Sequence, residues 1–138
     1  MNRRTLILSG AATLVLPALP ALAAPLDYKP GLTKERLDAG ETVFLDFKAS
    51  WCGTCRAQER VLEALKAANG DYEKNITFIN VDWDTYGNSV MADRLKIPRR
   101  STLVALKGKQ EIGRIVADTS ERNIKKLMDA ALAAATNA

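Results

Sequence analysis

Cys52 and Cys55 are the only cysteines of the chain, and they enclose two residues in the segment Trp51-Cys52-Gly53-Thr54-Cys55. Each cysteine can therefore pair only with the other or with a thiol of another molecule. This spacing is typical of dithiols that exchange with disulfides. A purely structural role is a poor alternative, because a disulfide stabilises more when it closes a longer loop, and this one closes almost none. We interpret the pair as redox-active.

The segments on either side predict that the cysteines lie where a strand gives way to a helix. Residues 42–48 are nearly continuously apolar and rich in β-formers, which is typical of a central strand buried on both faces. A helix is expected from about residue 53 to 69, and Gly70 ends it. The inner face of this helix is predicted at Ala57, Val61, Ala64, Leu65 and Ala68.

Thiol–disulfide exchange requires a thiolate, whereas a free cysteine has a pKa of about 8.5 and is mostly protonated at neutral pH. At the N-terminus of a helix, the helix dipole and the unpaired N–H groups favour an anion, so the pKa of the Cys52 thiol should be lowered. We expect Cys52 to be the exposed, attacking sulfur. Cys55, further into the helix, could then attack a mixed disulfide at Cys52, while Gly53 and Thr54 keep the turn compact and uncharged.

Asp46 is a carboxylate in the middle of the apolar strand, where an unpaired charge is costly to bury. One interpretation is a residue at the edge of the strand that reaches solvent. The other is a buried acid beneath the dithiol, with a pKa that burial raises toward neutrality. Such an acid could accept the proton of Cys55 when that thiol becomes the attacking thiolate.

The remaining elements predict one α/β domain with a mixed sheet and helices on both faces, in the order (α)βαβαββα. Parallel connections come first, and an antiparallel hairpin with Gly108 in its turn comes last. The last helix is expected to be capped by Ser120 and to face inward through Ile124, Leu127, Met128 and Ala131. Further strands are expected at 76–81, 102–106 and 111–117, and further helices at 33–39 (capped by Thr33) and 88–95.

The N-terminal segment 1–23 has the pattern of an export signal. A basic pair, Arg3-Arg4, precedes an uncharged apolar stretch at 5–16, and a small-x-small motif ends at Ala23. The stretch is shorter than the roughly 20 apolar residues that span a membrane. We expect cleavage after Ala23 and one domain of residues 24–138 in the periplasm. An uncleaved membrane anchor is the alternative, and Sec and twin-arginine export are both open.

Charge and composition narrow the classes of ligand. The chain has 20 Lys and Arg, 16 Asp and Glu and no His. Two of the basic residues lie in the signal, so the mature domain is nearly balanced, and we expect neither nucleic acid nor an anionic membrane as partner. Without histidine or a third cysteine, one monomer cannot build a closed four-ligand zinc site from Cys and His. We expect no metal and no cofactor.

The segment 45–55, Leu-Asp-Phe-Lys-Ala-Ser-Trp-Cys-Gly-Thr-Cys, resembles the active-site segment of thioredoxins, and the chain is most similar to exported thioredoxin-like proteins. The resemblance runs from about residue 33 to 132. Lys48 and Thr54 depart from cytosolic thioredoxins, which usually carry an aromatic residue and a proline there. The resemblance implies a thioredoxin fold, with Cys52 as nucleophile, Cys55 as resolving thiol, Asp46 as buried acid, and Trp51, Gly53 and Thr54 beside the substrate.

One departure concerns the cis-proline that faces the two cysteines in thioredoxins, just before the penultimate strand. Matching residues 102–108 to that strand puts Ser101 in its place, and Pro98, three residues earlier, is the alternative. A cis bond before serine would cost about 2.5–4 kcal/mol, so we expect a trans loop in which Arg100 and Ser101 face the dithiol and contact substrate. Arg100 there would favour a thiolate and attract an acidic substrate. The alternative is that Arg99 and Arg100 are solvated loop charges.

These inferences favour a monomeric, periplasmic thiol:disulfide oxidoreductase that reduces protein disulfides and takes electrons from a membrane thiol donor. The reducing direction rests on the likeness of Gly53 and Asp46 to thioredoxin. Potentials for this chemistry run from about −270 to −120 mV, so a disulfide oxidase or isomerase stays open. Two further alternatives are a soft-metal module that holds Cu(I) between the cysteines and a chaperone with an idle disulfide.

Overall fold

The computed structural model describes residues 10–14 and 24–137. The expected export signal lies outside the described residues except for 10–14, which form neither helix nor strand. Within the described ranges, no helix combines the length and apolar character needed to cross a membrane. The strands are β1 (Leu26–Asp27), β2 (Thr42–Lys48), β3 (Ile76–Asp82), β4 (Thr102–Lys107) and β5 (Gln110–Val116). The helices are α1 (Leu32–Asp38), α2 (Gly53–Ala68), α3 (Asp71–Asn75), α4 (Trp83–Tyr86), α5 (Val90–Arg94) and α6 (Glu121–Thr136).

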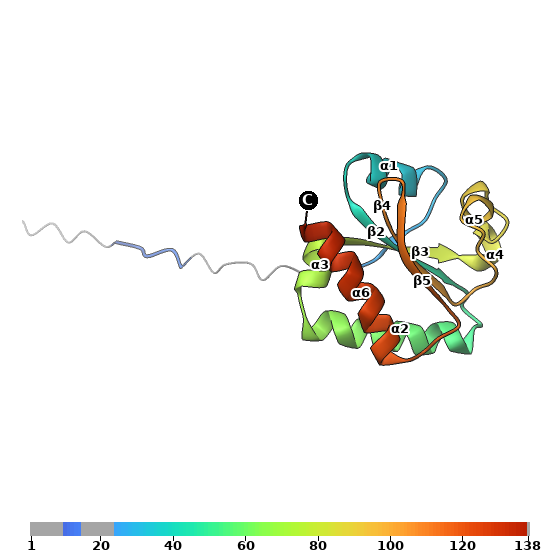
Figure 1. The fold of residues 1–138 in the computed structure, drawn as a ribbon. Helices are drawn as coiled ribbons and strands as arrows, with labels where there is room; N and C mark the ends of the chain where they lie inside the picture. Colours follow the sequence, from blue (N-terminus) through green and yellow to red (C-terminus); the bar gives the residue numbers. More distant parts are fainter. Residues whose placement is uncertain (1–9, 15–23, 138) are drawn as a thin grey trace, which may run out of the picture.

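The strands form one mixed sheet in the order β1-β3-β2-β4-β5. The central strand β2 runs parallel to β3 and antiparallel to β4, and β4 and β5 form the expected hairpin, with Gly108 in its turn at φ 57°. Helices α2, α3 and α6 cover one face, while α1, α4 and α5 cover the other (Figure 1). The predicted mixed sheet between two helical layers is therefore confirmed.

Strand β2 is buried on both faces, as its sequence predicts. Phe44 points into the core formed with α2 and α6, which also includes Leu62 and Met128. Val43, Leu45 and Phe47 point to the opposite core with α1 and α5. The site therefore rests on a strand that is packed from both sides, which fixes the start of α2. The predicted inner face of α6 is confirmed, because Ile124, Leu127, Met128 and Ala131 are all buried.

The inner face of α2 differs from the prediction. Only Leu65 of the predicted stripe is buried, while Ala64 and Ala68 are exposed. The stripe was misplaced because alanines were counted as apolar, and because two residues of the true inner face are polar. That face consists of Cys55, Gln58, Leu62, Leu65 and Lys66.

Other local differences are small. The two-residue strand β1 and the short helices α3 and α4 were not expected from the sequence. Helix α1 is capped by Gly31 at φ 90° rather than by Thr33, whereas Ser120 caps α6 as predicted and accepts the N–H of Asn123. Elements of two to five residues carry too little periodicity to stand out in a sequence.

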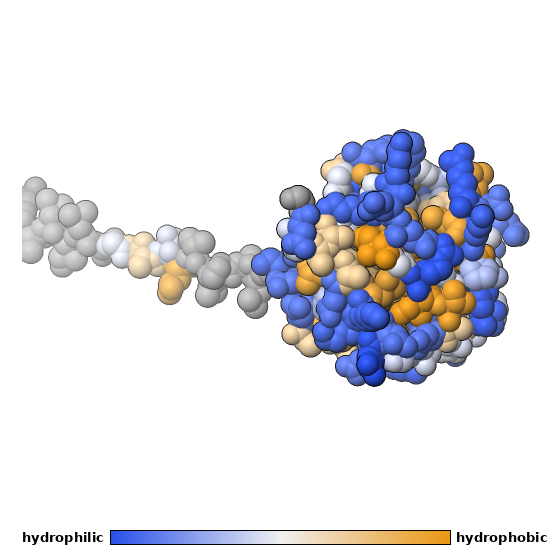
Figure 2. Space-filling view, viewed as in Figure 1, coloured by the Kyte–Doolittle hydropathy of each residue, from blue (hydrophilic) through white to orange (hydrophobic). Residues whose placement is uncertain are grey.

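Strand β5 is an edge strand, and α6 packs close against it. A Cβ at Gly113 would approach the Leu127 side chain to 3.0 Å, so the absence of a side chain at residue 113 permits this contact. Figure 2 shows apolar residues gathered in the middle of this view, over β5 and α6, with polar residues around them. Ile112, Ile115, Val116 and Leu127 are among the residues lining a groove between the two elements.

Candidate active site

Cys52 and Cys55 form a disulfide with their Cα atoms 5.2 Å apart. Strand β2 ends at Lys48, and the Cys52 N–H donates to the Ala49 carbonyl at 3.1 Å across the turn that follows. Cys52 then caps α2, because its Sγ accepts the backbone N–H of Cys55 at 3.1 Å. The Cys52 sulfur thus lies at a helix N-terminus, where the helix dipole and N–H groups that have no carbonyl partner within the helix favour negative charge.

The expectation of an exposed Cys52 is wrong for the disulfide form. Cys52 is 2% exposed and Cys55 1%. Ala49 and the half-buried Trp83 pack against the pair from one side, and Ser101 contacts it from another. Trp83 and Ser101 come from segments far from Cys52 in the sequence, which is why the local pattern did not predict the burial.

Ser101, rather than Pro98, faces the cysteines. The Ser101 hydroxyl oxygen lies 3.1 Å from the Cys52 Sγ and 3.1 Å from the Cys55 Sγ, and the residue is fully buried. Pro98 instead lines a separate groove of about 660 Å³ between α4, α5 and the segment before β4. Every peptide bond in the described part of the chain is trans, in agreement with the expected trans loop.

The Ser101 backbone is held in place by three hydrogen bonds. Its N–H donates to the Phe47 carbonyl at 2.7 Å, and its carbonyl accepts the Ala117 N–H at 2.8 Å and the Gln58 Nε2 at 3.0 Å. The same Gln58 amide also donates to the Asp118 carbonyl at 3.1 Å. Gln58 is a site residue that the sequence analysis missed. A polar residue one turn after Cys55, on the helical face that carries Cys55, was the available signal.

Asp46 is buried on the α2 side of β2. It is 5% exposed, and its Oδ1 has no hydrogen-bond partner among the residues that the structure describes. Burial raises the pKa of Asp46 to about 7; the Lys48 charge opposes this rise, Glu59 adds to it and Lys66 opposes it. Of the two interpretations of Asp46, the geometry supports the buried acid.

A cleft of about 430 Å³ leads to Asp46 between α2 and the sheet. Lys48 and Glu59 form an ion pair of 3.1 Å, and both line this cleft. Lys66 lines it as well, although it is 8% exposed, with its Nζ 4.0 Å from the centre of the Phe78 ring. Burial lowers the pKa of Lys66, and nearby carboxylates, Glu73 first, counteract the shift. Asp46 thus lies near charged side chains rather than in a purely apolar pocket.

Trp51 forms an exposed platform beside the buried disulfide. It is 55% exposed, and its indole N–H donates to the two Asp84 carboxylate oxygens at 3.1 and 3.0 Å. The Arg100 guanidinium lies over the Trp51 ring, with its central carbon 4.4 Å from the ring centre. Arg100 therefore packs on Trp51, a cation–π contact, instead of being a freely solvated charge. The Arg99 Nε donates to the carbonyl of the next residue, Arg100, at 3.1 Å.

The remaining predicted site residues, Gly53 and Thr54, are the first two residues of α2. Gly53 is exposed, and a Cβ placed there would meet no atom of residues 10–14 or 24–137 within 4 Å. Thr54 is partly buried in the first turn of α2. Among the described residues, no three Cys, His, Asp or Glu side chains come together in a group that could hold a metal ion.

The model of the thioredoxin family matches residues 31–130. The chain belongs to the thioredoxin family. Thioredoxin H2-1 of Oryza sativa subsp. japonica is 32% identical over 97 residues, which cover 68% of this chain and 66% of that protein. Thioredoxin of Mycolicibacterium smegmatis is 30% identical over 95 residues, which cover 68% and 82%. A Caenorhabditis elegans peptide-N(4)-(N-acetyl-beta-glucosaminyl)asparagine amidase is 35% identical over 78 residues, 56% of this chain but 12% of the amidase.

Solved structures agree with this assignment of the thioredoxin fold. The crystal structure of Trxlp from Edwardsiella tarda EIB202 superposes with a TM-score of 0.64 at 25% identity, covering 75% of this chain and 98% of that one. Reduced Schistosoma mansoni thioredoxin pre-protein gives a TM-score of 0.60 at 21% identity, covering 78% and 97%. Family membership and the Cys52–Cys55 disulfide together support thiol:disulfide oxidoreductase activity for this thioredoxin domain.

Proposed function

We propose that this thioredoxin domain is an exported thiol:disulfide oxidoreductase that reduces disulfides of other proteins in the periplasm. The observation that carries the proposal is the disulfide at the N-terminus of α2, on the same side of the sheet as the buried Asp46. The periplasmic location rests on the export pattern of residues 1–23. A reductant in that compartment needs electrons from across the membrane, so a membrane thiol protein is the proposed donor.

The exchange proceeds in two displacements. The Cys52 thiolate attacks one sulfur of the substrate disulfide, that S–S bond breaks, and the departing substrate thiolate takes a proton from solvent. Cys55 then gives its proton to the Asp46 carboxylate and attacks the Cys52 Sγ. The second substrate sulfur leaves as a thiolate while the Cys52–Cys55 disulfide forms. This thiolate takes a proton from solvent, and Asp46 returns its proton to solvent. Two electrons pass from the protein dithiol to the substrate, which ends as two thiols.

The midpoint potential of the Cys52–Cys55 pair tests the direction. We expect a value at or below about −230 mV when the mature domain, residues 24–138, is equilibrated against glutathione and dithiothreitol buffers, because reductants of this class lie there. Free thiols are counted after an acid quench at each buffer ratio. A Cys52→Ser, Cys55→Ser double variant supplies the baseline. A midpoint between about −180 and −120 mV would make the domain an oxidase or isomerase instead.

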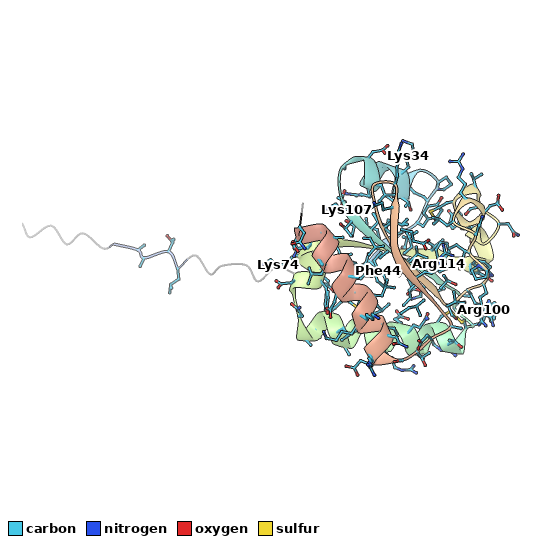
Figure 3. All side chains as sticks on the ribbon, in the orientation of Figure 1. Lys34, Phe44, Lys74, Arg100, Lys107 and Arg114 are labelled. Carbon is cyan, nitrogen blue, oxygen red and sulfur yellow. A yellow bond between two sulfur atoms is a disulfide. The ribbon has the colours of Figure 1, made fainter. Side chains whose placement is uncertain are left out.

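Trp51 and Arg100 are proposed to contact the substrate chain beside its disulfide, and the arginine to favour acidic sequences. An Arg100→Glu variant should lose about tenfold in kcat/KM for a disulfide peptide with flanking acidic residues, relative to the same peptide with flanking lysines. Lys74→Glu is the matched control, because it reverses a charge in the last turn of α3, far from Arg100 in Figure 3. The ratio to compare is kcat/KM for the acidic peptide divided by kcat/KM for the lysine peptide. If Arg100→Glu and Lys74→Glu change this ratio equally, a specific role for Arg100 is contradicted.

A further inference from the structure

We propose that the Ser101 hydroxyl is a catalytic group of the exchange centre, donating a hydrogen bond to the Cys52 thiolate while it accepts the S–H of Cys55. This inference rests on the proposed thiol–disulfide exchange, and it assigns a distinct task to the residue that takes the place of the cis-proline. The hydroxyl touches both reacting sulfurs, at 3.1 Å each.

The donors and acceptors fit the reduced state better than the disulfide state. A hydroxyl has one hydrogen and two lone pairs. Neither sulfur of a disulfide carries a proton, so Ser101 can donate to only one of them, and a disulfide sulfur is a weak acceptor. Once the pair is reduced, Cys52 as a thiolate accepts the Ser101 hydrogen, and the Cys55 thiol donates to the Ser101 oxygen. All three groups are then satisfied in one short chain of hydrogen bonds.

The position of the hydroxyl is fixed by its backbone. Ser101 has φ 62°, a conformation that is uncommon for a residue other than glycine. The bonds to Phe47, Ala117 and Gln58 hold it there. Since Ser101 is fully buried, water does not compete for the hydroxyl, and a charge-assisted hydrogen bond in such surroundings is stronger than one in water. An arrangement that is held this firmly can bias the charge state of the neighbouring sulfur.

The residue type at position 101 also supports a role for the hydroxyl. Residues with φ near +60° are usually Gly, Asn or Asp, so the loop geometry alone does not call for serine. A serine that serves only the loop could be replaced by glycine without loss. The two functions of the residue, loop geometry and hydrogen bonding to sulfur, can therefore be separated by substitution.

The test compares Ser101→Ala with Ser101→Gly. Both variants lose the hydroxyl, but glycine accepts the positive φ without strain whereas alanine does not. In both, we expect the pKa of the Cys52 thiol to rise by about one unit or more, which is a tenfold or greater loss of thiolate. The reduced form is thereby destabilised relative to the disulfide, so the midpoint potential should fall by about 30 mV for each tenfold change.

The pKa is measured from the pH dependence of alkylation by iodoacetamide, with Cys52 distinguished from Cys55 by fragmenting the peptide 49–56. This measurement needs no disulfide substrate, so it stands even if the proposed reductase activity fails. Thr102→Val is the matched control: it removes the adjacent buried hydroxyl, which donates to the Arg99 carbonyl at 2.7 Å, and should leave both quantities unchanged.

Two results would overturn the proposal. The first is an unchanged Cys52 pKa and potential in both Ser101 variants. The second is a change in Ser101→Ala that is absent from Ser101→Gly, because this would trace the effect to backbone strain rather than to the hydroxyl. A shift of similar size in both variants, without one in Thr102→Val, is the result that supports it.

Discussion

A Cys55→Ser variant is expected to accumulate covalent complexes with its disulfide partners, whereas a Cys52→Ser variant accumulates none. Both should lose catalysed disulfide reduction. The difference follows from position: Cys52 caps α2 and accepts the N–H that favours a thiolate, while Cys55 lies inside the first turn. Cys52 alone can attack a substrate, but without Cys55 the mixed disulfide is not resolved and persists.

The experiment uses the full chain, with its own residues 1–23, expressed in a bacterium. Cells are quenched with acid, free thiols are alkylated, and complexes are recovered from periplasmic and cytoplasmic fractions on a non-reducing gel. We expect complexes in the periplasmic fraction, with the protein beginning at Ala24, and a membrane thiol protein among the partners. Complexes formed equally by Cys52→Ser would contradict the assigned roles. Complexes confined to the cytoplasm, with residues 1–23 retained, would contradict export.

The sequence predicted the parts of the site that follow from continuous local pattern. The apolar run before the cysteines and the helical segment after them placed Cys52 at the start of α2, as the structure has it. Ser101 was placed opposite the cysteines by counting back from a strand of the right length, and its contacts to both sulfurs agree. The first of these inferences uses only the order and length of neighbouring elements, whereas the placement of Ser101 also rests on the resemblance to thioredoxins.

The rest of the site depends on contacts between distant segments. Trp51 meets Asp84 across 33 residues, and Trp83 covers the disulfide from α4, a helix too short to be predicted. Gln58 and Lys66 lie on the inner face of α2, where periodicity arguments assign polar residues to solvent. Gln58 is accommodated because it donates to two carbonyls, and Lys66 because it packs on an aromatic ring. Such compensation is visible only once the fold brings the partners together.

Replacing Asp46 with asparagine is expected to stabilise the domain above neutral pH and to slow its chemistry. The folded-state pKa of Asp46 is about 7, against 3.8 for the ordinary carboxyl. Between these values the folded protein keeps a proton that the unfolded chain has lost, so the free energy of unfolding falls as pH rises through this window and levels off above it. The difference between these two pKa values corresponds to about 4 kcal/mol of stability.

The parent should therefore lose stability between about pH 4 and pH 7 in urea unfolding, and Asp46→Asn should lose much less. Lys48, Glu59 and Lys66 face the same cleft and stay in both proteins, so their own contributions largely cancel in the comparison. Asp27→Asn is the matched control, because Asp27 is an exposed residue of β1. An equal pH slope in Asp46→Asn and the parent would show that the buried carboxyl does not cause the loss.

Asp46→Asn also tests whether the buried acid, which lowers stability at neutral pH, takes part in catalysis. If Asp46 takes the proton of Cys55, its replacement should slow resolution of the mixed disulfide by about 10²-fold or more, the usual contribution of a positioned base. Attack by Cys52 should be much less affected, since the helix N-terminus and not Asp46 favours that thiolate. Stopped-flow measurement of the two steps with a disulfide peptide distinguishes them. If Asp46→Asn is more stable at pH 8 but resolves the mixed disulfide as fast as the parent, Asp46 does not act as the base for Cys55.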